Sequence, residues 1–175
     1  MSRLKIFAIV LLCIPVVALV AFTEFYLPST ALVRITGIDV KRLDTGKETP
    51  SGQAVTRDVR FIYARDIHSG KDYAFRNEDT GWGWPIYFKF NSGTLAARAS
   101  NIKETEGESA VLMRYYGWRL PLFDMYPNVV NLKVVPSNYT HVPIFNIVFI
   151  IVVLALIGYL TYRIRRFRLR SSGDD

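Results

Sequence analysis

Two uninterrupted apolar segments, one near each end of the chain, constrain the fold more than any other feature of this sequence. Residues 6–22 are 17 residues without a charged side chain, and residues 144–162 are 19 residues whose one amide side chain is Asn146. Because a helix rises about 1.5 Å per residue, the first segment is close to the shortest length that crosses a bilayer. The second segment matches a hydrocarbon core of about 30 Å. The sequence therefore predicts two transmembrane helices that bracket residues 24–141.

The first segment has an alternative interpretation as a cleaved signal peptide. Arg3 and Lys5 precede it, as in the basic start of such a peptide. Cleavage after Ala21 would place Leu19 at the third position before the cut, where a small residue is preferred. We therefore favour an uncleaved anchor.

Basic residues flank both apolar segments on their outer sides. They are Arg3 and Lys5 before the first segment, and Arg163, Arg165, Arg166, Arg168 and Arg170 after the second. Loops rich in Lys and Arg stay in the cytoplasm. The predicted plan is a cytoplasmic N-terminus (1–5), a first transmembrane helix (6–22), an external domain (24–141), a second transmembrane helix (144–162) and a basic cytoplasmic tail (163–175).

The arginines of this tail can also contact anionic lipid headgroups, since basic residues beside a membrane contribute about 1 kcal/mol each near its surface. The simpler interpretation is a stop-transfer sequence that fixes orientation, and one segment can serve both purposes. In the second apolar segment, Asn146 can hydrogen-bond to another helix, either the first segment or a second copy of the chain. It can equally reach headgroup water, because it lies near the start of the segment.

Charge and cysteine usage limit the function classes. The formal net charge is +7, but residues 24–141 hold 15 Lys and Arg against 13 Asp and Glu, so the central region contributes only +2. The basic balance is thus a topology signal, and we expect no nucleic-acid partner. The one cysteine, Cys13, lies in the first apolar segment, so no disulfide is expected in the central region, and we expect no cofactor.

The central region predicts an α+β domain with a mainly antiparallel sheet. Alternation and turn residues predict strands at 32–43, 56–66, 72–77, 109–116 and 128–135, a loop at 44–53, and a helix at 94–103 with Ser92 as its N-cap. In the second strand, Val59, Phe61 and Tyr63 share one face. The order of one helix among five strands is also that of a small oligonucleotide- or oligosaccharide-binding (OB) barrel, which we keep as an alternative.

The densest chemistry lies in residues 76–90. Glu78 and Asp79 are adjacent carboxylates, and Trp82 and Trp84 flank a glycine before a proline. As a ligand loop, the acids would orient a polar group of a sugar or peptide and the indoles would stack on it. As a structural loop, the acids would pair with arginines, and the tryptophans would pack in the core or at a membrane interface, which Trp favours.

Residues 115–119 repeat this mixture on a smaller scale. Trp118 and Arg119 would complete an aromatic and cationic cluster with the first run, although Arg on Trp is also a common packing contact. His68 and His141 are too few and too far apart in sequence to predict a zinc site. No nucleophile elbow, P-loop or dinucleotide motif is present, so an enzyme would have to use the carboxylates of residues 78 and 79.

Several of these segments together resemble one family. They are residues 33–42, residues 56–61, residues 76–90 and residues 116–119. The chain resembles, over nearly its whole length, the bacterial membrane-protein family called domain of unknown function 1523. The resemblance implies a Gram-negative inner-membrane protein with a periplasmic domain, and it implies no reaction, cofactor or catalytic residue.

The leading functional hypothesis is a non-enzymatic inner-membrane protein whose periplasmic domain binds another membrane or envelope protein or helps to assemble an envelope complex. The alternative is a periplasmic sensor or binder of sugar or peptide that uses Glu78, Asp79, Trp82, Trp84 and Trp118. A carboxylate-dependent enzyme is the third class.

Overall fold

The computed structural model describes residues 3–48, 50, 52 and 54–171, and it describes the backbone alone for 3–13, 45–48, 54, 164 and 167–171. The chain divides into two compact units, Met1–Tyr139 and Thr140–Asp175, and each is described by itself. The first unit holds helix α1 and a β-barrel with helix α2. The second holds helix α3.

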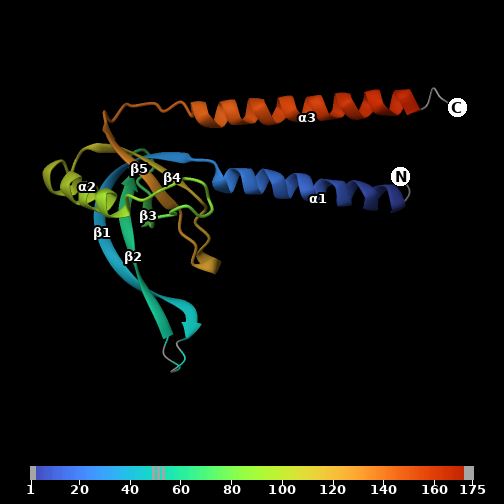
Figure 1. The fold of residues 1–175 in the computed structure, drawn as a ribbon. Coiled ribbons are helices and arrows are strands. Elements are labelled where there is room, and N and C mark those ends of the chain that lie inside the picture. The colour runs from blue at the N-terminus through green and yellow to red at the C-terminus, as the bar shows by residue number, and fades with distance from the viewer. Residues whose placement is uncertain (1–2, 49, 51, 53, 172–175) are drawn as a thin grey trace. The chain divides into compact units, whose positions relative to one another are not determined.

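Five strands form a closed barrel in the first unit (Figure 1). They are β1 (Ser29–Glu48), β2 (Ala54–Asp66), β3 (Asp72–Asn77), β4 (Ala110–Tyr116) and β5 (Asn128–Val135). Around the barrel they follow the order β1-β2-β3-β5-β4. The neighbouring strands are antiparallel except β3 and β5, which meet in parallel at Arg76 and Asn128. The α+β class with a mainly antiparallel sheet is confirmed.

The strands of the first hairpin are longer than predicted. Residues 44–48 were expected in a loop, yet β1 continues to Glu48, which pairs with Ala54 of β2. Strand pairing uses backbone groups, so a polar segment extends a ladder without apolar side chains. The expectation of a loop over all of 44–53 was therefore wrong for its first half.

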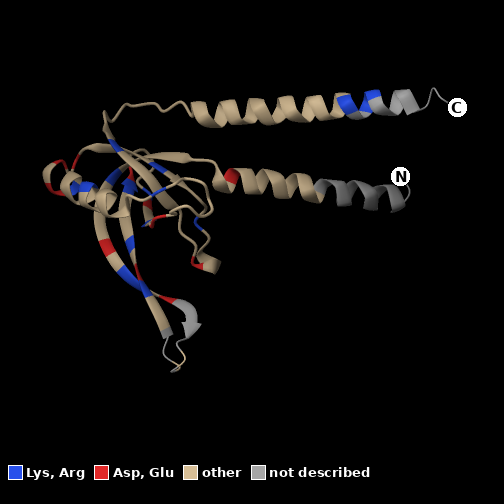
Figure 2. Ribbon diagram, in the orientation of Figure 1, with Lys and Arg blue, Asp and Glu red and all other residues tan. Residues whose placement is uncertain are grey.

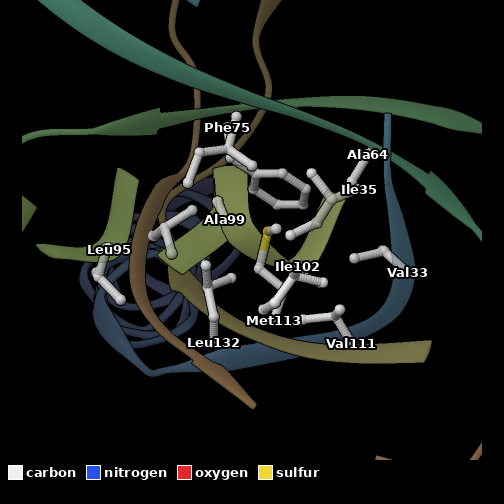
Figure 3. Packing of buried hydrophobic residues seen from close by; sticks show 12 residues of the cluster. Val33, Ile35, Ala64, Phe75, Leu95, Ala99, Ile102, Val111, Met113 and Leu132 are labelled. Atoms are coloured by element: carbon white, nitrogen blue, oxygen red, sulfur yellow. The ribbon is translucent and has the colours of Figure 1, made fainter. Parts of the chain in front are cut away.

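The barrel interior is packed mainly with aliphatic side chains, together with Met113 and the Phe75 ring (Figure 3). Ile62 and Ala64 of β2 face this interior together with Phe75 of β3. Helix α2 (Ser92–Thr105) closes it with Leu95, Ala99 and Ile102, all buried. The spacing of these three residues confirms the predicted helix, because side chains three and four residues apart share one face.

The start of α2 differs in detail from the prediction. Ser92 is the first helical residue, and Asn91 occupies the N-cap position without a side-chain capping bond. The side chain that serves the helix start belongs instead to Asp79, which accepts hydrogen bonds from the Ser92 backbone N–H (2.8 Å) and hydroxyl (2.6 Å). A cap supplied by a residue 13 positions upstream depends on the fold and has no local sequence signal.

Helix α1 (Arg3–Tyr26) contains the first predicted span, and α3 (Ile144–Ser171) contains the second. Within the part of the chain whose side chains are described, one helix is long and apolar enough to cross a membrane. It is Ile144–Arg163, with a mean hydropathy of 2.7. The described apolar part of α1, Ile14–Tyr26, is shorter. The first span therefore stays a prediction, and the side chains of Arg3, Lys5 and Cys13 lie outside the described residues.

The charged side chains that are described in α3 lie toward one end of the helix. Its charged side chains are Arg163, Arg165 and Arg166, all exposed and all after the apolar stretch (Figure 2). Arg168 and Arg170 lie outside the residues with described side chains. Asn146 lies in the first turn of α3 and is half-buried.

Candidate functional site

The two adjacent carboxylates of residues 76–90 hold different parts of the barrel. Glu78 follows β3 and forms ion pairs with Arg57 of β2 (3.3 Å) and Arg76 of β3 (3.1 Å). Its backbone N–H donates to the side-chain oxygen of Asn128 (2.9 Å). Asp79 turns to Ser92 at the start of α2. The ion pairs of Glu78 are those expected of a structural loop, whereas the hydrogen bonds of Asp79 to the start of α2 were not predicted.

A buried lysine, Lys89, lies near these acids, and the sequence analysis did not single it out. Lys89 is only 4% exposed, and its ammonium group donates to the Asn77 side-chain oxygen at 2.6 Å. Burial lowers the pKa of Lys89 to about 8, while the nearby carboxylates of Asp79 and Glu78 oppose that shift. In the sequence, Lys89 stands between Phe88 and Phe90, and this pattern does not indicate that its side chain is buried.

Trp82 and Trp84 lie on the same loop but pack against different partners. Trp82 is 83% exposed and contacts the rings of Phe88 (5.7 Å between centroids) and Phe90 (5.2 Å). Trp84 contacts Phe22 (5.9 Å) and Tyr26 (5.1 Å) at the end of α1. The two indoles therefore do not form one stacking site.

A second set of contacts joins α1 to the barrel. The Gly117 N–H donates to the Phe25 carbonyl at 2.9 Å, and Trp118 packs edge-on against the Phe25 ring at 5.3 Å. The Tyr87 hydroxyl donates to the Tyr26 carbonyl. Burial raises the pKa of Tyr87 to about 12, which keeps this donor protonated. The end of α1 thus contacts Trp84 and Tyr87 of one loop and Gly117 and Trp118 of another. We call these contacts the α1 junction.

The outer surface of β1, β2 and β3 carries cations beside aromatic rings. We call it the cation–aromatic face, and its members are Lys41, Arg57, Phe61, Tyr63, Arg76, Arg119 and Tyr126. Strand pairing places Lys41 opposite Val59, and Phe61 opposite Arg76, so these side chains share one side of the sheet. Phe61 and Tyr63 point away from the interior that Ile62 fills.

Residues of the β4–β5 segment lie over this face. The Tyr126 ring packs edge-on against Phe61 (5.0 Å), and the Arg119 guanidinium stacks on Tyr126 (3.8 Å). Lys41 lies over Phe61 at 5.5 Å and over Tyr63 at 5.8 Å. The hydroxyl of Tyr63 is the main cause of a raised pKa of Lys41, so this ammonium stays charged at neutral pH.

Two cavities open beside the β4–β5 segment. One, of about 310 Å³, is lined by Arg76, Glu78, Tyr116, Tyr126, Asn128, Asp124 and Met125, with Gly117, Phe25 and Phe123. The other, of about 360 Å³, is lined by Trp118, Arg119, Glu24, Ser29, Tyr73, Phe75, Tyr115, Gly117 and Pro127. Gly117, at the start of this segment, lines both cavities.

The predicted site residues are thus only partly brought together. Glu78 lines the first cavity, and Trp118 and Arg119 line the second. Trp82 and Trp84 line neither, and Asp79 serves the helix start. No group of three His, Cys, Asp or Glu side chains that could hold a metal occurs among those described.

Sequence reasoning missed the aromatic members of the cation–aromatic face. Phe61 and Tyr63 were seen on one face of a strand, but their contact with Tyr126, more than 60 residues later, is a tertiary one. The side-chain pattern of β2 was a signal for a contact on its outer face, since Ile62 and Ala64 make the opposite face apolar as well. A strand that is apolar on both faces must be covered on both.

The chain is similar to a known protein family over most of its length. A model of the family described as "Protein of unknown function (DUF1523)" matches residues 4–168. An uncharacterized protein of Haemophilus influenzae is 38% identical over 120 residues, which is 67% of this chain and 67% of the relative. No solved structure matches the chain significantly. Because the family match runs from α1 through the whole barrel into α3, the chain belongs to the DUF1523 family.

Proposed function

We propose that this protein is a membrane-anchored binding module of the bacterial inner membrane. In this proposal α1 and α3 both cross the membrane, both termini are cytoplasmic, and the barrel lies in the periplasm. The barrel binds another envelope protein without catalysing a reaction. The positions of basic residues beside both apolar helices support this topology.

The single observation that carries the binding role is the cation–aromatic face with its adjoining cavity of about 310 Å³. The strand order β1-β2-β3-β5-β4, with a helix between β3 and β4, suits an OB-type barrel. Barrels of that type bind extended ligands across the face of strands 2 and 3 and the loop between strands 4 and 5. The cation–aromatic face and the β4–β5 segment occupy those places here.

The charges of this region favour an acidic partner. The region holds one more cation than carboxylates. The cations are those of Lys41, Arg57, Arg76 and Arg119, and the carboxylates are those of Asp39, Glu78 and Asp124. Arg57 and Arg76 already pair with Glu78, so their remaining N–H groups and the Arg119 guanidinium would supply the donors for carboxylates of the partner. The half-buried rings of Tyr63 and Tyr126 offer apolar contact. We therefore propose that the partner presents an extended peptide segment rich in Asp or Glu.

A labelled oligo-glutamate peptide tests this proposal. Fluorescence anisotropy with the full chain in detergent should show binding that weakens as salt is added. An Arg57→Gln/Arg76→Gln variant should lose about tenfold or more in affinity, which corresponds to about 1.4 kcal/mol. Arg98→Gln on α2 changes the charge of an exposed residue outside the face and should have no effect.

The outcomes separate the alternatives. An equal loss in Arg98→Gln would show that general charge is being measured, and absence of peptide binding would exclude the acidic partner. Binding of a neutral oligosaccharide that is insensitive to salt would replace the peptide with a sugar as the ligand of this face.

A further inference from the structure

We infer that the loop between β3 and α2, with the tip of the β4–β5 segment, is a lipid-contacting surface that seats the barrel in the headgroup region of the bilayer. We call this surface the apolar collar, and its members are Trp82, Trp84, Ile86, Phe88, Phe90 and Phe123. The inference rests on the membrane anchoring of α1 in the proposed function and is independent of the peptide partner.

The collar exposes large apolar side chains that a soluble surface rarely concentrates in one place. Trp82 is 83% exposed, Ile86 is 61% exposed, and Phe123 is 68% exposed. Contiguous exposed apolar side chains of this size mark a contact with a membrane or a partner. The remaining collar residues are all more than half exposed.

The loop is built to hold these side chains outward. Its base is closed by hydrogen bonds from the Thr80 and Gly81 N–H groups to the Lys89 carbonyl (3.1 and 3.0 Å), and by one from the Lys89 N–H to the Thr80 hydroxyl (3.1 Å). The buried side chain of Lys89 fixes this base inside the barrel through Asn77. Inside this closed loop, Trp82 packs on Phe88 and Phe90, which keeps the rings together without burying them.

Trp84 joins the collar to the apolar surface of α1, and this contact points to lipid as the occupant. Ile14, Val17 and Val20 of α1 are each exposed by more than half. Phe22 continues that surface to Trp84, which stacks on it at 5.9 Å. Phe123 lines the same cavity as Phe25, in the last turn of α1, so the second collar segment lies near this helix end as well.

The position of the collar along α1 matches an interface. Glu24 is the first charged residue after the apolar stretch, and Trp84 and Trp118 pack against residues 22–26 at the same level. Figure 1 shows the collar loop beside the end of α1, while α2 lies on the other side of the barrel. Indole rings favour the depth where apolar chains meet headgroups.

Depth-dependent quenching of tryptophan fluorescence tests the inference in the full chain. The protein is reconstituted into vesicles of phosphatidylcholine and phosphatidylglycerol that contain lipids brominated either near the headgroup or near the chain end. A Trp84→Phe/Trp118→Phe variant leaves Trp82 as the reporter. Two further reporters, each in a background without the three native tryptophans, carry Ala97→Trp on α2 or Val17→Trp in α1.

We expect Trp82 to lose fluorescence with bromine near the headgroup and to lose less with bromine near the chain end. The Ala97→Trp reporter should keep its fluorescence with both lipids, and the Val17→Trp reporter should lose most with bromine near the chain end. Phe88→Asp should reduce the loss at Trp82. Val40→Asp, at an exposed valine of β1 outside the collar, should leave that loss unchanged.

Two failures are distinguishable. If Val17→Trp is quenched while Trp82 keeps its fluorescence, α1 is anchored but the collar does not contact lipid, and the inference is wrong. If Val17→Trp also keeps its fluorescence, the anchoring of α1 in the proposed function fails, and the collar inference fails with it. Far-UV circular dichroism equal to that of the unmodified chain confirms that each variant is folded.

Discussion

At the scale of single residues, three polar side chains of residues 78–89 hold the end of the barrel together. Asp79 caps a helix, Glu78 holds Arg57 and Arg76, and Lys89 reaches inward to Asn77. The sequence could show that Glu78 and Asp79 lie together, because they are adjacent in it, but it did not single out Lys89. Their partners lie on other elements, so their roles followed only from the fold.

Replacing Asp79 should destabilise the barrel. Asp79→Ala removes two hydrogen bonds to Ser92 at the start of α2, and we expect a loss of about 1–3 kcal/mol in the free energy of unfolding. The matched control is Asp58→Ala, which breaks an exposed ion pair with Arg42 and should cost less than about 1 kcal/mol. Thermal unfolding of the full chain in detergent measures both, and equal losses would contradict a capping role.

The buried ammonium of Lys89 predicts a pH dependence of stability. Its pKa is about 8 in the folded chain and ordinary, near 10.5, when unfolded. Between these values the unfolded state binds more protons, so this group makes stability rise as pH increases from about 8 to about 10. Across this window, the free energy of unfolding of the unmodified chain should therefore rise relative to that of Lys89→Met.

The comparison with Lys89→Met cancels other titrations. Burial raises the pKa values of Tyr87, Tyr115 and Tyr116, so their ionisation lowers stability at the alkaline end in both proteins. A difference between the two proteins that stays constant over the window would show that Lys89 titrates normally.

At the scale of elements, the α1 junction connects a helix to the barrel through two loops that are distant in sequence. The sequence predicted the positions of the helices and strands, because hydrophobic periodicity is a local property, although β1 and α3 both extend beyond their predicted ends. It did not predict that residues 82–90 and 117–118 meet the end of α1. Those contacts depend on how the closed barrel places its loops.

Tyr87→Phe tests this junction. The change removes the hydrogen bond to the Tyr26 carbonyl and keeps the ring that stacks on Tyr116 at 4.6 Å. We expect about 1 kcal/mol less protection of the Gly117 amide, which donates to Phe25 in the same junction, as measured by hydrogen exchange. Tyr73→Phe on β3 is the control and should leave the Gly117 amide unchanged.

At the scale of the whole molecule, the proposed topology predicts opposite accessibility of the barrel and the C-terminus. In a Cys13→Ser background, Lys103→Cys on the exposed side of α2 should react with a membrane-impermeant maleimide once the outer membrane is permeabilised. A cysteine added after Asp175 should react only when the inner membrane is broken. Reaction of both in intact inner membranes would contradict two spans with cytoplasmic ends.

The sequence by itself determined the apolar helices, the charge asymmetry and the α+β content, because length, composition and periodicity act along the chain. The tertiary structure decided what the central residues do. It closed the sheet into a barrel, turned Lys89 inward, left Trp82 exposed and covered Phe61 with Tyr126. The physical reason is that burial and pairing are made between elements distant in sequence, so the same aromatic residue suits a core, a ligand site or a lipid surface until the fold places it.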